Sequence, residues 1–235
     1  MIKDPLISII LVTYNAEEFL QRCLDSIYIQ AYTPNEIIII DGGSTDKSIE
    51  IIRDNADKIA FWKSEKDDGI YDAMNKALDY TQGQWIYFIG ADDTLTPEFS
   101  ELAKELKNAD CIYYGSVYKA GKKYLGKLSR YHQAKTGINH QAIIYPSQIF
   151  ADNRYDTSYK ISADHVFNMG FNRHEKYHFE FKDFIIANFN DTGISSLQKD
   201  AVFESRKGRL IIKYFGLKIY LRFQFKKLKA KLFKS

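Results

Sequence analysis

The chain has 235 residues, 45% of them hydrophobic and 27% charged, which fits one large folded domain with a substantial core. The first residues show no signal-peptide pattern, and no stretch reaches the roughly 18 uncharged apolar residues that a membrane-spanning helix needs. Cys23 and Cys111 have no CxxC spacing and no nearby histidine cluster. This argues against a disulfide framework and a zinc site, and predicts reduced thiols in a cytosolic setting.

The net charge of +3 conceals a strong asymmetry along the chain. Residues 205–235 contain 11 Lys or Arg and no Asp or Glu, which leaves 22 basic and 30 acidic residues in the rest. An acidic body therefore carries a basic tail. We expect a catalytic or binding domain over residues 1–204 and a separate tail over residues 205–235.

Buried strand patterns alternate with helical patterns over the first hundred residues. This alternation predicts an α/β fold with a mostly parallel sheet and helices on both faces. The predicted strands are 7–12, 36–40, 59–62 and 86–89, and the predicted helices are 16–30, 44–55 and 70–80. The second half reads as strands over 109–115, 142–146 and 179–188, with a strand or hairpin over 117–128 that turns at Gly121.

Polar side chains follow the predicted strands, at the edge where open α/β sheets bind ligands. The adjacent carboxylates of Asp92 and Asp93 would suit a hard divalent cation, Mg²⁺ or Mn²⁺, beside a nucleoside diphosphate. An Asp pair can also begin a turn or cap a helix, and Thr94 to Pro97 looks like a helix start. Neither a GxGxxG nor a GxxxxGK[ST] motif is present, which argues against a dinucleotide oxidoreductase and a P-loop NTPase.

Four segments in this order resemble the motifs of the family 2 glycosyltransferases. They are Ser8–Ala16, Ile40–Asp46, Asp67–Lys76 and Gly90–Asp93. The resemblance is specific over the first hundred residues and continues more loosely to about residue 200. It implies a GT-A fold, with a nucleotide-binding half over 1–100 and an acceptor half over 101–204. It also implies a nucleotide-sugar donor, a divalent metal ion and transfer with inversion.

The resemblance also assigns roles to residues at the strand ends. It implies that Asp41 accepts a hydrogen bond from a uracil-type base and that Asp67 lies by the ribose or base. Asp92 and Asp93 match the metal-binding DxD element, although Gly90 stands where Asp or Asn is more usual. The metal is then expected mainly on Asp93, with Asp92 also near the sugar or ribose. The remaining nucleotide contacts are Thr13, Tyr14 and Asn15.

In the second half, the resemblance places His140 and Gln141 near the donor sugar and acceptor. It identifies Asp164 as the catalytic base, and inverting displacement does need a carboxylate to take the proton of the acceptor hydroxyl. His165 stands where Tyr or another large residue is usual, so acceptor contacts are expected to differ. The simpler alternatives are a histidine that caps a strand end and an Asp that caps a helix. Residues 191–196 resemble a loop at the mouth of the active site.

Apolar residues of the tail recur at steps of three and four, which is typical of an amphipathic helix in a membrane interface. Such a helix would bind an anionic membrane surface through residues 205–235. The open alternative is a helix packed on the domain with solvated lysines, and Gly216 is expected to bend or break it. The stripe comprises Leu210, Tyr214, Leu217, Leu221, Phe225, Leu228 and Leu232.

The sequence thus predicts a metal-dependent inverting glycosyltransferase that moves one sugar from a nucleoside-diphosphate donor, with UDP expected. The resemblance implies a saccharide acceptor, often lipid-linked, in cell-surface polysaccharide or lipopolysaccharide assembly. The enzyme would lie peripherally on the inner face of the cytoplasmic membrane. The Gln-x-x-Arg-Trp motif of processive synthases is absent, which favours single-sugar addition. Two alternatives are a nucleic-acid-binding protein that uses the basic tail, although no nucleic acid is expected, and an inactive family member that binds nucleotide.

Overall fold

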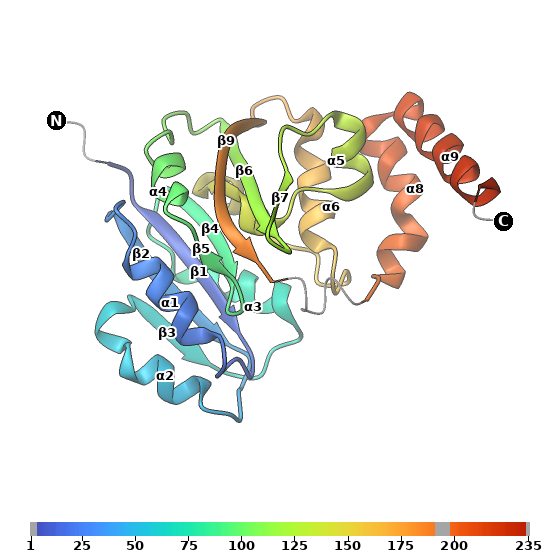
Figure 1. Cartoon of the computed structure of the whole chain (residues 1–235). Coiled ribbons are helices and arrows are strands. Elements are labelled where there is room, and N and C mark those ends of the chain that lie inside the picture. The colour runs from blue at the N-terminus through green and yellow to red at the C-terminus, as the bar shows by residue number, and fades with distance from the viewer. Residues whose placement is uncertain (1–3, 191–197, 234–235) are drawn as a thin grey trace.

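The computed structural model describes residues 4–190 and 198–233, and Figure 1 shows how its elements are arranged. Within these residues the strands form one nine-stranded sheet of order β3-β2-β1-β4-β8-β6-β9-β5, with β7 paired to β6. The strands are β1 Ile7–Thr13, β2 Asn35–Asp41, β3 Phe61–Ser64, β4 Trp85–Gly90, β5 Thr94–Leu95, β6 Cys111–Lys119, β7 Lys122–Leu125, β8 Ile143–Pro146 and β9 His178–Phe189.

Helices cover both faces of this sheet. Short 3₁₀ turns connect several of the elements, and the turn His140–Ala142 matters for the site. The α-helices are α1 Leu20–Tyr28, α2 Ser48–Asp54, α3 Ile70–Ala77, α4 Glu98–Ala103, α5 Arg130–Thr136, α6 Ala163–Gly170, α8 Ala201–Phe215 and α9 Leu217–Leu232.

The sheet is parallel in its first half and mixed in its second. Strands β3, β2, β1 and β4 run parallel, as the alternating sequence pattern predicts. Strand β8 is antiparallel to both β4 and β6, whereas β6 and β9 are parallel to each other. The α/β prediction is confirmed, and the carboxyl ends of β1, β2 and β4 meet at one edge.

The apolar run of β1 is continuous because both faces of this strand are buried. Its side chains alternate between the two faces of the sheet. Ile7, Ile9 and Leu11 enter one core with α1 and α4, while Ile10 and Val12 enter the other with α3, α5, α6 and α8. Because both faces are buried, no polar alternation is possible along this strand.

Two boundaries differ from the sequence prediction, one because side chains bind the backbone and the other because a short strand forms. Helix α1 begins at Leu20 rather than Ala16. The backbone amides of Ala16 and Glu17 instead donate to Ser48 Oγ and to an oxygen of Asp46. The helix predicted to begin near Thr94 starts at Glu98, because Thr94–Leu95 pairs with β9 as strand β5.

The tail forms two helices rather than one. Gly216 adopts φ +87, a left-handed conformation that favours glycine, and separates α8 from α9. The predicted boundary at residue 204 falls inside α8, whose Phe203, Ile211 and Phe215 are buried in the core. Figure 1 shows the two helices as a hairpin at one end of the molecule.

The predicted apolar stripe divides between these helices. Leu210 and Tyr214 of α8 pack against the core. The α9 part of the stripe is exposed, with Leu217, Leu221, Phe225, Leu228 and Leu232 between 57% and 68% accessible. Both helices therefore pack on the domain, and only α9 also exposes an apolar face. Among the described residues, no helix is long and apolar enough to cross a bilayer.

Candidate active site

The strand register brings the predicted polar residues to one edge of the sheet. Thr13 at the end of β1 pairs with Asp41 at the end of β2, and Asp41 pairs in turn with Ser64 on β3. On the other side of β1, Val12 pairs with Gly90, two residues before Asp92. The loops that follow β1, β2 and β4 therefore surround a common region, as the sequence predicts.

Asp41 lies at the centre of the loop after β2 and is fully buried. Its Oδ2 accepts hydrogen bonds from the amides of Gly43 and Ser44, each at 2.9 Å, and from Ser64 Oγ at 2.7 Å. Its Oδ1 accepts from Ser44 Oγ at 2.5 Å. The carboxylate therefore orders this loop, and a contact with a nucleobase would have to replace one of these bonds.

The exposed surface beside this loop belongs to Tyr14 and Asp67. Tyr14 is 63% exposed, and Asp67 is partly exposed with its Oδ1 fixed by the amide of Gly69 at 2.8 Å. Gly42 lies between them. A Cβ atom at this position would come within 2.6 Å of Asp67 Oδ2 and 3.4 Å of the Tyr14 ring. An aromatic face beside a carboxylate can stack on a base and bind its polar edge.

Thr13 and Asn15 hold the loop after β1 in place. The carbonyl of Thr13 accepts a hydrogen bond from the amide of Gly42 at 2.9 Å, and its hydroxyl is buried without a partner among the described residues. Asn15 has φ 46, and its side-chain oxygen accepts from the amide of Thr45 at 2.9 Å. The loops after β1 and β2 are therefore joined by hydrogen bonds.

Asp93 is a buried carboxylate whose two oxygens both accept hydrogen bonds. It is 1% exposed, and it accepts from Gln141 Nε2 at 2.7 Å and from the amide of Asn190 at 2.8 Å. Burial and the neighbouring charge of Asp92 raise the pKa of Asp93 from 3.8 to about 6. Asp92 is partly exposed and accepts from Asn190 Nδ2 at 3.3 Å.

Gly90 gives these two carboxylates room to turn back over the end of β4. A Cβ atom at position 90 would lie 3.0 Å from Asp92 Oδ1 and 3.2 Å from Asp93 Oδ2. A larger side chain here would push the carboxylates away. The usual first residue of the DxD element is Asp or Asn. Gly90 replaces it here, and the close approach of the two carboxylates leaves little room for a side chain at this position.

The Asp92 and Asp93 pair fits a divalent cation. Two oxygen ligands at the end of one strand suit Mg²⁺ or Mn²⁺, which take further ligands from phosphate and water. Burial and the adjacent Asp92 raise the pKa of Asp93, so a bound cation would stabilise its ionised form. The resemblance places the metal mainly on Asp93. Asp92 is the more accessible of the two carboxylates, so an incoming metal ion would reach Asp92 first.

Asp164, the predicted base, lies at the first turn of α6 with 15% of its side chain exposed. Its Oδ1 accepts hydrogen bonds from Tyr71 Oη at 2.9 Å and from the amide of His165 at 2.7 Å. Its Oδ2 lies 3.5 Å from His140 Nδ1. Burial acts to raise the pKa of Asp164, but the His140 and Tyr71 contacts outweigh it and hold the pKa below its ordinary value.

His140 and Gln141 are consecutive residues of one 3₁₀ turn that serves both carboxylates. His140 contacts Asp164, and Gln141 donates to Asp93. The hydroxyl of Tyr87, on β4, donates to the carbonyl of Gln141 at 2.9 Å and so ties the turn to the sheet. The structure therefore brings the predicted base and the predicted metal ligands together through this pair.

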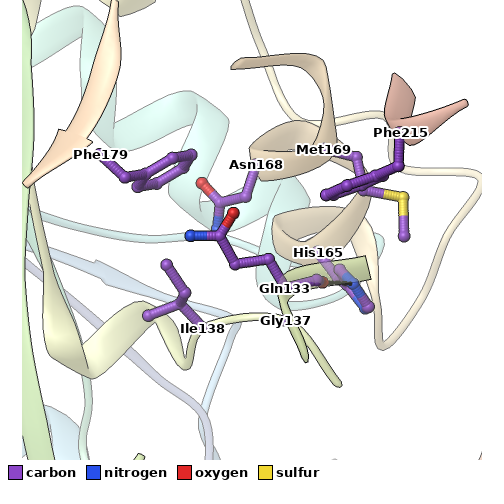
Figure 2. Close-up of a pocket in the computed structure, with 8 residues that line it drawn as sticks. All are labelled: Gln133, Gly137, Ile138, His165, Asn168, Met169, Phe179 and Phe215. Atoms are coloured by element: carbon purple, nitrogen blue, oxygen red, sulfur yellow. Dashed lines mark hydrogen bonds between the residues drawn. The ribbon is translucent and has the colours of Figure 1, made fainter. Parts of the chain in front are cut away.

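His165 does not share this surface, although it follows Asp164 in sequence. Its ring is buried and its Nε2 lies 2.8 Å from the carbonyl of Gln133. Figure 2 shows it beside Gln133 and Gly137, lining a cavity of about 10 Å³ that Phe215 of α8 helps to close. Burial lowers the pKa of His165 to about 4, so the ring is neutral at pH 7. Its position supports packing rather than the acceptor contact that the sequence predicts.

Asp200 joins the start of α8 to the segment that precedes the base. Its Oδ1 accepts from the amide of Phe203 at 3.0 Å, which caps α8. Its Oδ2 accepts from the amides of Ile161 at 3.0 Å and Ser162 at 3.2 Å, immediately before α6. Asp200 is itself buried, so the orientation of α8 is fixed relative to Asp164.

Sequence reasoning missed Tyr71, Ser64 and Asn190, which hold the carboxylates of Asp164, Asp41 and Asp93. Tyr71 lies inside the Asp67–Lys76 motif. Its position there was the one sequence feature that could have pointed to a role in the site. Asn190 carries no such signal, because only the fold brings it beside β4. The predicted loop over residues 191–196 lies outside the described residues.

Comparison with known proteins gives the family of this chain. Residues 8–179 match the family described as Glycosyl transferase family 2. The chain belongs to this family. A PGL/p-HBAD biosynthesis glycosyltransferase of Mycobacterium bovis (strain BCG / Pasteur 1173P2) is 31% identical over 201 residues, which cover 80% of this chain and 78% of that protein. An uncharacterized glycosyltransferase of Haemophilus influenzae is 41% identical over 105 residues, or 43% of this chain and 41% of that protein.

Solved structures of other glycosyltransferases share the fold. TarS 1-349 from S. aureus in complex with UDP-GlcNAc has a TM-score of 0.68 at 16% identity, covering 89% of this chain and 71% of that one. The mannosyltransferase PcManGT from Pyrobaculum calidifontis was solved in complex with GDP-Man and Mn²⁺. It has a TM-score of 0.62 at 15% identity, and the match covers 91% of this chain and 64% of that one. This family 2 glycosyltransferase therefore has the predicted GT-A fold.

Replacing the buried Asp93 by Asn is expected to stabilise the metal-free enzyme above about pH 6. A folded-state pKa raised from 3.8 to about 6 means that Asp93 favours folding when protonated and loses this contribution as pH rises through about 6. The loss is roughly 3 kcal/mol at about pH 8. Melting curves in EDTA should show Asp93→Asn and wild type converging near pH 4 and separating toward about pH 8. A constant difference across this range would contradict the shift.

Replacing Tyr71 by Phe is expected to move the acid limb of the kcat/KM profile to higher pH. The change removes a hydrogen bond that favours the ionised form of Asp164, so the pKa of this carboxyl rises. Tyr32→Phe is the matched control, because it also removes one buried hydroxyl, whose bond goes to the carbonyl of Pro5. An acid limb that shifts equally in both variants, or in neither, would show that Tyr71 does not act on Asp164.

Proposed function

We propose that this enzyme is a metal-dependent inverting glycosyltransferase that moves one sugar from a nucleoside diphosphate to a saccharide acceptor. The observation that carries this proposal is the turn His140–Ala142, whose first two residues contact Asp164 and Asp93. A general base and a pair of metal-binding carboxylates are the two parts that such a transfer needs.

In the proposed reaction, Asp164 accepts the proton of an acceptor hydroxyl. The acceptor oxygen forms a bond to the anomeric carbon of the donor sugar as the bond from that carbon to the diphosphate oxygen breaks. The nucleoside diphosphate leaves on the opposite face, which inverts the configuration. A Mn²⁺ or Mg²⁺ ion held by Asp92 and Asp93 would neutralise charge on the diphosphate. His140 and Tyr71 position the base throughout.

The nucleotide is expected to lie over the loops after β1 and β2. The exposed Tyr14 ring and the Asp67 carboxylate flank Gly42 and offer a surface for the base and ribose. Asp41 supports this surface from below through its bonds to Gly43 and Ser44. UDP is the first nucleotide to test because TarS was solved with UDP and with UDP-GlcNAc, and GDP is the second because PcManGT was solved with GDP-Man.

Thermal stability with UDP, TDP, GDP, CDP and ADP, each with Mn²⁺ or EDTA, tests the donor site. A ligand at one hundred times its dissociation constant adds ~2.7 kcal/mol of stability. For a chain of this size the melting temperature should rise by roughly 5–10 °C. We expect one diphosphate to give this shift with Mn²⁺ only, and Asp92→Asn or Asp93→Asn to remove it.

The exposed Asp57 precedes the amino end of β3, whereas the site lies at the carboxyl ends of the parallel strands. It gives the matched control Asp57→Asn, which should retain the full shift. Tyr14→Ala should weaken the nucleotide shift while leaving the unliganded melting temperature unchanged, because this ring is 63% exposed. If no diphosphate stabilises the wild type, or if Asp92→Asn and Asp93→Asn respond like wild type, the proposed donor site is wrong.

We also propose that α9 attaches the enzyme to an anionic membrane, where lipid-linked saccharide acceptors of cell-surface polysaccharide or lipopolysaccharide assembly would lie. Its exposed stripe, defined here as Leu217, Leu221, Phe225, Leu228 and Leu232, faces away from the domain. The opposite side, with Ile219, Tyr220 and Phe223, packs against the core. An aliphatic outer surface favours lipid over nucleic acid, which binds through cations and aromatic rings.

The charges of the tail support the same partner. Residues 205–235 carry 11 basic and no acidic side chains, and each basic residue near an anionic surface contributes about 1 kcal/mol. Arg222 and Lys226 lie over the ring of Tyr131 on α5, 4.4 and 5.0 Å from its centre, yet both remain exposed. Positive charge therefore flanks the apolar stripe, as an interfacial helix requires.

Sedimentation with vesicles tests this attachment. The full chain should bind vesicles that contain phosphatidylglycerol, bind phosphatidylcholine vesicles weakly, and dissociate as salt rises. Leu221→Glu with Phe225→Glu should abolish binding, since both residues are on the exposed stripe and neither supports the fold. Ile29→Glu is the control, because Ile29 is 77% exposed at the end of α1.

Two results would overturn the membrane proposal. One is that the wild-type chain does not bind anionic vesicles, or that the stripe variant binds as well as wild type. The other is a solution dimer that the stripe variant dissociates, together with absent vesicle binding, which would make the stripe a contact between two copies. Light scattering after size-exclusion chromatography separates these cases. Tight binding of duplex DNA by the tail would favour the nucleic-acid alternative.

A further inference from the structure

A second cluster of metal-ligating side chains lies at the amino ends of β6 and β9. Cys111 Sγ is 3.2 Å from His178 Nε2 and 3.2 Å from Glu180 Oε2. All three ligand atoms lie within 4.8 Å of one another. Among the described residues this is the one group of three His, Cys, Asp or Glu side chains with such a spacing.

The sheet register fixes this cluster. Cys111 pairs directly with His178, and Tyr113 pairs with Glu180 on the parallel strand β9. Because side chains alternate along a strand, His178 and Glu180 project from the same face. The three side chains are therefore aligned by paired backbone rather than by a loop, which keeps their relative positions constant.

The cluster lies at the opposite edge of the sheet from the donor site. Strand β6 runs in the same direction as β4, since both are antiparallel to β8. Cys111 begins β6, whereas Asp92 and Asp93 follow the carboxyl end of β4. Figure 1 shows β6 and β9 side by side over their length. A ligand at the cluster would not touch the proposed metal pair of the active site.

We propose that Cys111, His178 and Glu180 form a Zn²⁺ site, with water as the fourth ligand. Thiolate sulfur and imidazole nitrogen favour Zn²⁺ over Mg²⁺ or Mn²⁺, which prefer oxygen. Tetrahedral zinc with bonds of ~2.0 to ~2.3 Å separates its ligand atoms by ~3.3 to ~3.6 Å. The observed separations of 3.2 Å from sulfur need only small side-chain rotations to match.

Binding of Zn²⁺ releases one proton and raises the charge of the site by one. In the metal-free chain the Cys111 thiol donates its hydrogen to Glu180. Zn²⁺ forms bonds to the sulfur, to His178 Nε2 and to the carboxylate, and the thiol proton leaves to solvent. Lys182 donates to Glu180 Oε1 at 3.1 Å and thus occupies the oxygen that the metal does not need.

The proposed site runs against the expectation, drawn from the sequence, that neither cysteine belongs to a zinc site. His178 and Glu180 are 67 and 69 residues from Cys111, so no local spacing motif exists. The pairing of β6 with β9 is what brings them together. The inferred role is a staple between the two strands, distinct from the chemistry at Asp92 and Asp93.

Titration of the full chain with Co²⁺, followed by displacement with Zn²⁺, tests the site. A thiolate ligand gives Co²⁺ an intense charge-transfer absorption in the near ultraviolet, which carboxylates alone do not produce. We expect this band in wild type, its loss on adding Zn²⁺, and a higher melting temperature with Zn²⁺. His178→Ala and Glu180→Gln should each weaken Zn²⁺ binding by about tenfold or more.

The controls separate this site from the active site and from misfolding. Cys23→Ser should keep the band, because Cys23 is buried against the carbonyl of Gly90. Asp93→Asn should also keep it, and His178 is exposed, so its replacement should leave the fold intact. Lys182→Met should strengthen Zn²⁺ binding, since it removes a cation from Glu180. Absence of the band in wild type, or its persistence in Cys111→Ser, would overturn the proposal.

Discussion

The arrangement of the active site depends on the 3₁₀ turn of His140 and Gln141. One residue of the turn contacts the carboxylate of Asp164 on α6, and the next donates to the carboxylate of Asp93 after β4. Both contacts come from adjacent residues, so the distance between the proposed base and the proposed metal pair is set by one short segment. Tyr87 holds the carbonyl of that segment from inside the core.

The two carboxylates have opposite environments within this one site. Asp93 is buried beside Asp92, and its pKa rises because burial and the negative charge of Asp92 outweigh its hydrogen bonds. Asp164 is also largely buried, yet Tyr71 and His140 contacts keep its pKa low. The first is therefore suited to bind a cation, and the second is ionised at neutral pH, which is the state in which a base accepts a proton. The free energy that Asp93 costs the metal-free fold becomes available for metal binding.

The sequence predicted the features that local pattern determines. Continuous β-branched runs located β1, β2 and β4, and the polar residues after them were correctly placed at one edge because parallel strands end together. Features that depend on tertiary contacts were not predictable. The burial of Asp41 by Ser44 and Ser64 is one such feature, and the inward direction of His165 is another. The break at Gly216 was expected from the sequence, but the burial of Phe203, Ile211 and Phe215 of α8 in the core was not.

Asp200 connects the tail helices to the segment that carries Asp164. Its carboxylate caps α8 and also holds the two amides that precede α6, so the helix hairpin and the base belong to one rigid unit. Helix α8 has 15 residues and is therefore about 22 Å long. An enzyme anchored through α9 would hold its catalytic opening at a constant height and tilt above the lipid. Acceptors would then be selected partly by reach, because only those whose terminal sugar extends to that height could be glycosylated.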